Sequence, residues 1–284
     1  MSEKSFIAKI SEIILKYTKP KYMDSKEAVD EFLAEKSKTQ DKPVKSIFKS
    51  MNFNGMQVFT FGNKEKSKNV ILYMHGGAYV NEIGWQHYLY CLKLSRKLNS
   101  YVLAPVYGLA PKHKAMESFD GIRELYEDTL KLEKNITLMG DSAGGGFVLS
   151  FAQYLKNNNL PQPKNIVVFS PWVDISMSNP PYDSANEPIL GEIGLKEMGK
   201  SWAGELDITD YRVSPLFGDK FGLAKTLIFA GEDEIFYKDI KRYAKNDDNV
   251  KLITGKGLYH IYPLFPIPEA KKAFREIESE ILDL

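Results

Sequence analysis

Apolar residues recur along this chain with two periods, one typical of strands and one typical of helices. Short apolar runs predict buried strands at residues 69–74, 101–107, 135–139, 165–169, 226–230 and 250–254. Helical spacing predicts helices between and after them, at residues 83–98, 115–132, 144–157, 236–245 and 268–282. Repeated alternation of strand and helix indicates an α/β fold, with a mostly parallel sheet covered by helices on both faces.

Two further strands are predicted ahead of this alternation. Residues 44–53 and 56–61 flank Asn54-Gly55, a strong signal for a hairpin. With this hairpin the central sheet has about eight strands.

Two other segments do not follow the alternation. Residues 4–18 form an amphipathic helix with Phe6, Ile10, Ile13, Ile14 and Tyr17 on one face, and a second helix is expected over 25–36. These helices are expected either to pack on the core or to cover a site. The predicted organisation is N-terminal cap helices at 1–40, a core at 41–172 and 224–284, and a cap insertion at 173–223, with one helix at 195–203.

Composition excludes several classes of protein. The chain has 284 residues, of which 43% are hydrophobic, and its 38 Lys and Arg nearly balance 37 Asp and Glu, which predicts no nucleic-acid partner. The single cysteine, Cys91, allows no intramolecular disulfide and is expected in the core. No apolar run approaches the roughly 18 residues of a membrane span, and charges interrupt the N-terminal stretch, so a cytoplasmic location is expected.

The pentapeptide Gly140-Asp-Ser-Ala-Gly144 lies between a predicted strand and a predicted helix. A serine at such a corner has a strained backbone and an exposed hydroxyl, and a side chain two residues to either side would collide with the turn. Ser142 is therefore the candidate nucleophile. Of the four histidines only His260 follows Ser142, and in hydrolase sheets the order is nucleophile, acid, histidine, so His260 is the candidate base.

A carboxylate is needed to hold the histidine tautomer. The strand at 226–230 runs into Glu232, Asp233 and Glu234, any of which could supply it. An anion site is also needed. Its donors are expected from the amide of Ala143 and from the glycine turn His75-Gly76-Gly77, which follows strand 69–74. His75 and Asp141 are expected to support these motifs. No metal or organic cofactor is required.

Six motifs occur in an order that resembles the hormone-sensitive-lipase-like branch of the α/β-hydrolase family. They are His75-Gly-Gly-Ala-Tyr, Tyr107-Gly-Leu-Ala-Pro, Gly140-Asp-Ser-Ala-Gly-Gly, Ser170-Pro-Trp-Val-Asp, Ser214-Pro-Leu and Ala230-Gly-Glu-Asp. The resemblance covers about residues 68 to 265. It implies an α/β-hydrolase fold with a lid built from the N-terminal helices and the insertion.

The resemblance also implies site residues. The family's acid follows Ala-Gly-x, which selects Asp233 and gives the triad Ser142, Asp233 and His260. The oxyanion hole would be Gly76, Gly77 and Ala143. The sequence departs from the family pattern at three positions: Gly108 stands in place of arginine, Glu234 in place of proline, and Ala78 in place of a third glycine.

The sequence therefore predicts a serine carboxylesterase that hydrolyses short-acyl esters through an acyl-enzyme. Deacetylase, amidase or peptidase chemistry on the same triad is the alternative, and a non-catalytic ligand-binding homologue is a further one. The expected partner is a small ester substrate, and the expected state is a monomer or homodimer.

Overall fold

The apolar runs form the strands of one sheet in the computed structural model, which describes residues 4–40, 42–180 and 187–282. Within these residues the sheet has eight strands: β1 (Ser50–Phe53), β2 (Met56–Phe61), β3 (Asn69–Met74), β4 (Ser100–Pro105), β5 (Asn135–Asp141), β6 (Asn165–Phe169), β7 (Lys225–Gly231) and β8 (Val250–Gly255). Their spatial order is β1-β2-β4-β3-β5-β6-β7-β8. β2 pairs antiparallel with β1 and β4, and the other pairs are parallel. The predicted fold class is confirmed.

The predicted strand at 44–53 is too long, since its ladder begins only at Ser50. Val44 instead exchanges hydrogen bonds with the amide side chain of Gln57: its N–H donates at 2.8 Å, and its carbonyl accepts at 3.1 Å. The side chain of Gln57 thus supplies the hydrogen bonds that a neighbouring strand would otherwise make to the backbone of Val44.

Five helices cover the two faces of the sheet: α3 (Trp85–Lys97), α4 (Ala115–Leu130), α5 (Ser142–Asn157), α7 (Tyr237–Ala244) and α8 (Pro268–Leu282). The other described helices are α1 (Phe6–Tyr17), α2 (Lys26–Thr39) and α6 (Glu192–Ala203), with short 3₁₀ turns η1 (Lys21–Met23), η2 (Pro215–Phe217) and η3 (Tyr262–Leu264). Side chains alternate along β3, so Val70, Leu72 and Met74 pack with α4, α5 and α7, while Ile71 and Tyr73 pack with α3 and α8. Cys91 of α3 is buried in the second cluster, as predicted.

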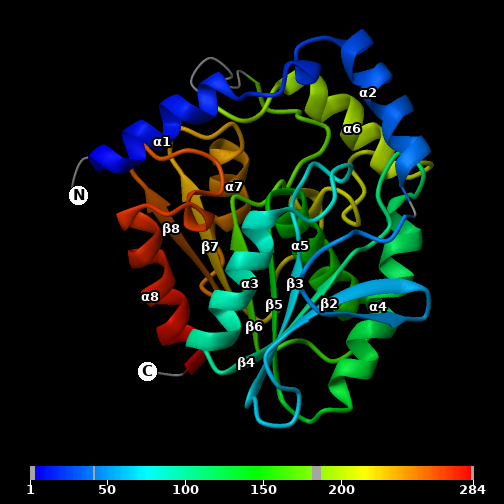
Figure 1. The fold of residues 1–284 in the computed structure, drawn as a ribbon, viewed down its shortest axis with the longest axis vertical. Coiled ribbons are helices and arrows are strands. Elements are labelled where there is room, and N and C mark those ends of the chain that lie inside the picture. Colours follow the sequence, from blue (N-terminus) through cyan, green and yellow to red (C-terminus); the bar gives the residue numbers. More distant parts are fainter. Residues whose placement is uncertain (1–3, 41, 181–186, 283–284) are drawn as a thin grey trace.

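The helices α1, α2 and α6 lie together along one end of the molecule (Figure 1). α2 and α6 pack on each other and on η1, where an added Cβ at Gly194 of α6 would lie 2.8 Å from Cβ of Met23. Residues 1–3, 41 and 181–186, which belong to the predicted cap and core segments, lie outside the described residues.

The apolar face of α1 does not pack on the core, which was one of the two expectations for this helix. Phe6, Ile10, Ile13, Ile14 and Tyr17 are all exposed. The helix docks instead through its opposite face, where Ala8 is fully buried. Apolar periodicity identified the helix correctly, but it could not tell which face meets the protein.

Candidate active site

The turn between β5 and α5 presents Ser142 at the carboxyl end of the sheet. Ser142 has φ +53°, a left-handed conformation that few non-glycine residues adopt. A Cβ on Gly140 would lie 2.6 Å from the carbonyl oxygen of Gly144, and one on Gly144 would lie 2.2 Å from that of Met74. Only glycine fits at both positions, so the pentapeptide is a consequence of the close approach of β3 to the turn.

Two hydrogen bonds connect Ser142, His260 and Glu234 in a line. The Oγ of Ser142 lies 2.8 Å from Nε2 of His260, and Nδ1 of His260 lies 3.0 Å from Oε2 of Glu234. Since an ionised carboxylate can only accept, Nδ1 carries the proton and Nε2 is left to accept from the serine hydroxyl. All three residues are buried.

The expected acid, Asp233, is not in this line, and that prediction is wrong. Its side chain is 44% exposed, and its carboxylate lies 3.9 Å from Nζ of Lys4. The N–H of Asp233 donates to the carbonyl of Leu258 at 3.0 Å, which fixes the turn so that Asp233 points outward and Glu234 points to His260. The motif spacing taken from the family was off by one residue, because the direction of the turn decides which acid faces inward.

A second buried carboxylate, Glu187, bonds to the same turn, and no sequence pattern pointed to it. Its Oε2 accepts from the N–H of Ile235 at 3.1 Å, directly after Glu234, and its Oε1 accepts from the N–H of Ile189 at 2.8 Å. The backbone carbonyl of Glu187 accepts from Nζ of Lys19 at 3.2 Å. The segment after β6 and the N-terminal region are thereby both tied to the acid turn.

Burial and charge act in opposite directions on the pKa of His260. Burial lowers it, but the hydrogen bond to Glu234 and the charges of Glu234 and Glu187 raise it further, so the pKa of His260 lies above 6.5. Burial raises the pKa of Glu234 above 4.5, and the bond to His260 opposes that rise. The second carboxylate, Glu187, therefore favours a protonated His260.

The predicted donor role of Gly76 is also contradicted. Its N–H donates to Oδ1 of Asp141 at 3.0 Å and is already engaged inside the protein. The next residues turn sharply: φ is +123° at Gly77, +54° at Ala78 and +62° at Tyr79. Among the hydrogen bonds of the described residues, none uses the N–H of Gly77 or Ala78.

Ala143, the third expected donor, lies in the first turn of α5. Amides there have no acceptor within the helix, and the helix dipole favours negative charge beside them. The amides of Gly77 and Ala78, rather than that of Gly76, are therefore the candidate donors from the glycine turn, beside the amide of Ala143.

Asp141 is the centre of a buried polar network behind the glycine turn. Besides Gly76, its Oδ1 accepts from the hydroxyl of Tyr73 at 2.8 Å, and its Oδ2 lies 3.2 Å from Nε2 of His87. Nδ1 of His87 accepts from the N–H of Gly84 at 2.9 Å, so the Nε2 proton is directed at Asp141. Burial raises the pKa of Asp141, but His87 and Tyr73 lower it more, so it lies below 3.8. Sequence reasoning missed Tyr73 and His87, which sit inside an apolar strand and helix.

His75 lies within the glycine turn and is buried. Its Nδ1 lies 2.8 Å from the carbonyl of Gly76, and its ring stacks on Tyr107 at a centroid distance of 4.7 Å. The hydroxyl of Tyr107 donates to the carbonyl of His75 at 2.7 Å. Burial, and then the neighbouring His87, lower the pKa of His75 to about 4, so it is neutral near pH 7.

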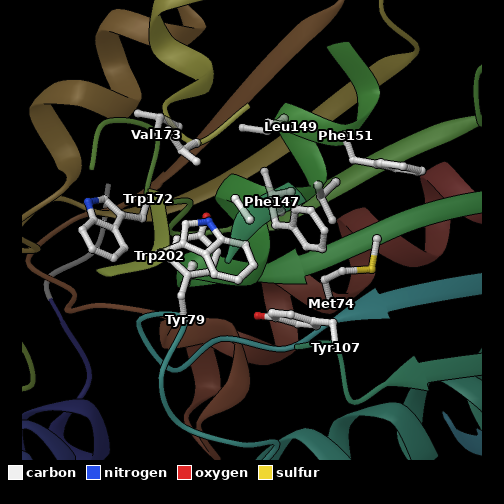
Figure 2. Packing of buried hydrophobic residues seen from close by; sticks show 14 of the residues in the cluster. Met74, Tyr79, Tyr107, Phe147, Leu149, Phe151, Trp172, Val173 and Trp202 are labelled. Atoms are coloured by element: carbon white, nitrogen blue, oxygen red, sulfur yellow. The ribbon is translucent and has the colours of Figure 1, made fainter. Parts of the chain in front are cut away.

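Aromatic rings pack beside the serine turn. Figure 2 shows Tyr79, Trp202 and Phe147 close together, with Trp172 beside them. The ring of Trp202 in α6 stacks on Tyr79 with ring centres 4.4 Å apart. The backbone N–H of Trp172 donates to the carbonyl of Ser142 at 2.9 Å. The ring of Phe236 stacks on Trp172 at 5.6 Å and meets His260 edge-on at 5.3 Å. The neighbours of Ser142 and His260 are therefore largely aromatic.

The described residues contain no group of three or more His, Cys, Asp or Glu placed to hold a metal ion. No helix among them is both long and apolar enough to cross a bilayer. The cytoplasmic location and the oligomeric state, a monomer or homodimer, stay predictions.

Comparison with known proteins defines the class. Residues 71–264 match a family model described as alpha/beta hydrolase fold, and the chain belongs to this family. A hormone-sensitive lipase from a metagenome library shares the fold, with a TM-score of 0.81 and 22% identity over 97% of this chain and 98% of that one. The predicted resemblance to the hormone-sensitive-lipase-like branch is confirmed.

Curated relatives give the enzyme type. An esterase from Acinetobacter venetianus is 28% identical over 73% of each chain, and an acetyl-hydrolase from Streptomyces hygroscopicus is 28% identical over 72% of each. A Staphylococcus aureus protein solved as a candidate esterase has a TM-score of 0.85 and 26% identity over 90% of this chain and 93% of that one. The chain is thus an esterase- or lipase-type α/β-hydrolase, which confirms the predicted class of carboxylic ester hydrolase.

Proposed function

We propose that the protein is a serine carboxylesterase with the triad Ser142, His260 and Glu234. The observation that carries this proposal is the buried hydrogen-bonded line from Oγ through the imidazole to the carboxylate, 2.8 and 3.0 Å long. His260 takes the proton of Ser142 as Oγ attacks the ester carbonyl. Glu234 holds the imidazole tautomer and stabilises the imidazolium that forms.

The developing oxyanion is bound by the amides of Gly77, Ala78 and Ala143. His260 next protonates the departing alcohol and leaves Ser142 acylated. Water then enters, gives its proton to His260 and attacks the acyl carbon, and return of that proton to Oγ releases the acid.

We propose short acyl groups as the preferred substrates. The ring of Trp172 stacks on Tyr79 and on Phe236, and Phe236 contacts His260, so large buried rings lie beside the candidate triad. The acetyl-hydrolase relative supports the same size class. The helices α1, α2 and α6 and the segment from 173 to 223 would form a cap over this pocket.

The test compares two serines of the same helix. Ser142→Ala should lower kcat on p-nitrophenyl acetate and butyrate by about 10³-fold or more, and a serine-reactive phosphonate should label the wild type at Ser142. Ser150→Ala is the matched control, since Ser150 is buried in α5 and makes no contact with His260 among the described residues; it should keep near wild-type activity. Activity of Ser142→Ala close to that of the control would overturn the proposal.

A panel of substrates distinguishes an esterase from an amidase and tests the preferred acyl length. Hydrolysis rates should fall as the acyl chain lengthens from acetyl to octanoyl, because the aromatic wall limits its size. An anilide of the same acyl group should be cleaved far more slowly than the ester. Faster anilide cleavage would favour an amidase, and a phosphonate that fails to label folded protein would favour a non-catalytic homologue.

A further inference from the structure

The largest exposed apolar feature of the described chain is one face of α1. Six of its side chains are exposed: Phe6 (76%), Ile7 (52%), Ile10 (43%), Ile13 (55%), Ile14 (57%) and Tyr17 (88%). At 100° per residue these positions span an arc of about 120°. A continuous stripe of this kind marks an interaction surface, whereas single exposed apolar residues need no explanation.

The fold does not need this stripe for packing, because α1 already packs on the protein through its opposite face. Ala8 is fully buried there, in the cluster that holds Leu258 and Tyr259. At the start of α1 the N–H and hydroxyl of Ser5 donate to the two carboxylate oxygens of Glu269, at 2.7 and 3.0 Å. The apolar face is therefore held outward, at the edge of the molecule (Figure 1).

The charges beside the stripe are basic. Lys9 and Lys16 lie along one flank of it, Lys21 follows the helix, and all three are exposed. Glu12 is the single acidic residue between positions 4 and 21, and it lies on the docked side, bonded to Lys4 and Lys16. An apolar stripe flanked by lysines is complementary to an anionic lipid surface. A second copy of the chain would instead bring the same lysines together.

We propose that α1 docks on the surface of an anionic phospholipid membrane, with its isoleucines in the headgroup–acyl boundary and its lysines on the headgroups. α1 packs on the segment that follows β8, which also carries His260. Docking therefore holds the candidate active site close to the lipid. Esters whose alcohol part is anchored in lipid would be delivered to it.

Vesicle flotation tests the docking without relying on catalysis. Wild-type protein should float with phosphatidylcholine vesicles that contain about 20% phosphatidylglycerol, and floating should weaken as salt is raised. The variant Ile10→Ser/Ile13→Ser/Ile14→Ser should lose binding by about tenfold or more. Its control, Ile47→Ser/Phe221→Ser, removes comparably exposed apolar residues away from α1 and should bind like wild type.

A charge variant tests the lipid specificity. Lys9→Gln/Lys21→Gln should reduce binding to the anionic vesicles by about tenfold and leave weak binding to pure phosphatidylcholine unchanged. Melting temperatures should stay near wild type in every α1 variant, because the substituted side chains are exposed, so a loss of binding is not a loss of fold. Wild type that fails to float, or an isoleucine variant that binds equally, overturns the proposal. So does a dimer in solution that the isoleucine variant abolishes while wild type ignores vesicles.

Discussion

The two sides of the candidate site are built differently. On the side of β3 and β5, the glycine turn and Ser142 are fixed by the sheet and by the buried carboxylate of Asp141. On the side of β7 and β8, Glu234 and His260 lie on loops, and a carboxylate outside the sheet, Glu187, bonds the acid turn. The first side is part of the core, whereas the second depends on segments that cover it.

This difference predicts which substitutions should lower stability and which should lower the reaction rate. A change on the first side removes a partner from buried polar groups and should cost stability as well as rate. A change on the second side should alter the protonation and orientation of His260, and so should act mainly on rate and its pH dependence. The following variants test this division.

The largest effect is expected at Glu234. Glu234→Gln keeps the size of the side chain but removes the charge that holds the His260 tautomer, so kcat should fall by about 10³–10⁴-fold. The matched control is Asp233→Asn, one residue earlier, which should stay within about twofold because Asp233 is exposed. Steady-state kinetics on p-nitrophenyl butyrate measure both. The reverse ranking would restore Asp233 as the acid.

Asp141→Asn should show the loss of stability expected on the side of β3 and β5. It removes a buried charge that accepts from Gly76, Tyr73 and His87, so we expect a loss of about 3–5 kcal/mol in the free energy of unfolding. Urea denaturation measures this loss. Glu234→Gln in the same assay should lose less than Asp141→Asn, and equal losses would remove the distinction between the two sides.

The low pKa of His75 predicts a loss of stability in acid. In the unfolded chain this histidine takes up its proton near pH 6.5, whereas in the folded chain it does so only near pH 4. The unfolded state thus binds more protons in that interval, and the free energy of unfolding should fall by about 3 kcal/mol as the pH drops from 6.5 to 4. His75→Gln should flatten this part of the curve. His113→Gln, at a partly exposed histidine paired with Glu117, should leave it unchanged.

The smallest effect concerns the acid limb of the pH–rate profile. Catalysis needs neutral His260, so kcat/KM should fall as the pH drops through the raised pKa of His260, above 6.5. Glu187→Gln removes one of the charges that raise this pKa, so the limb should move to lower pH, by up to about one unit. Glu192→Gln, at an acid paired with Lys196 in α6, is the control and should not move it. An unmoved limb in Glu187→Gln would limit Glu187 to a structural role.

The sequence predicted the parallel part of the sheet and the pairing of Ser142 with His260, which lie 2.8 Å apart. Alternating apolar periods predicted the strands, and chain order left His260 as the one histidine after Ser142. Two of the wrong predictions, Asp233 and Gly76, concern backbone turns. Whether Asp233 or Glu234 faces inward depends on the bond from Asp233 to Leu258, and Gly76 loses its donor to Asp141 across the sheet. Glu187 and the outward face of α1 depend on contacts between distant segments, which periodicity cannot register.

The hydrogen bonds from Ser5 to Glu269 also affect folding during synthesis. The two residues are 264 positions apart, so the first helix is synthesised long before its docking partner exists. At 5–20 residues per second that interval lasts tens of seconds. Throughout it, the apolar stripe and Ala8 of α1 are both uncovered on the nascent chain, where collapse onto a wrong surface competes with correct docking. α8 therefore completes the docking of α1, a helix made more than 250 residues earlier.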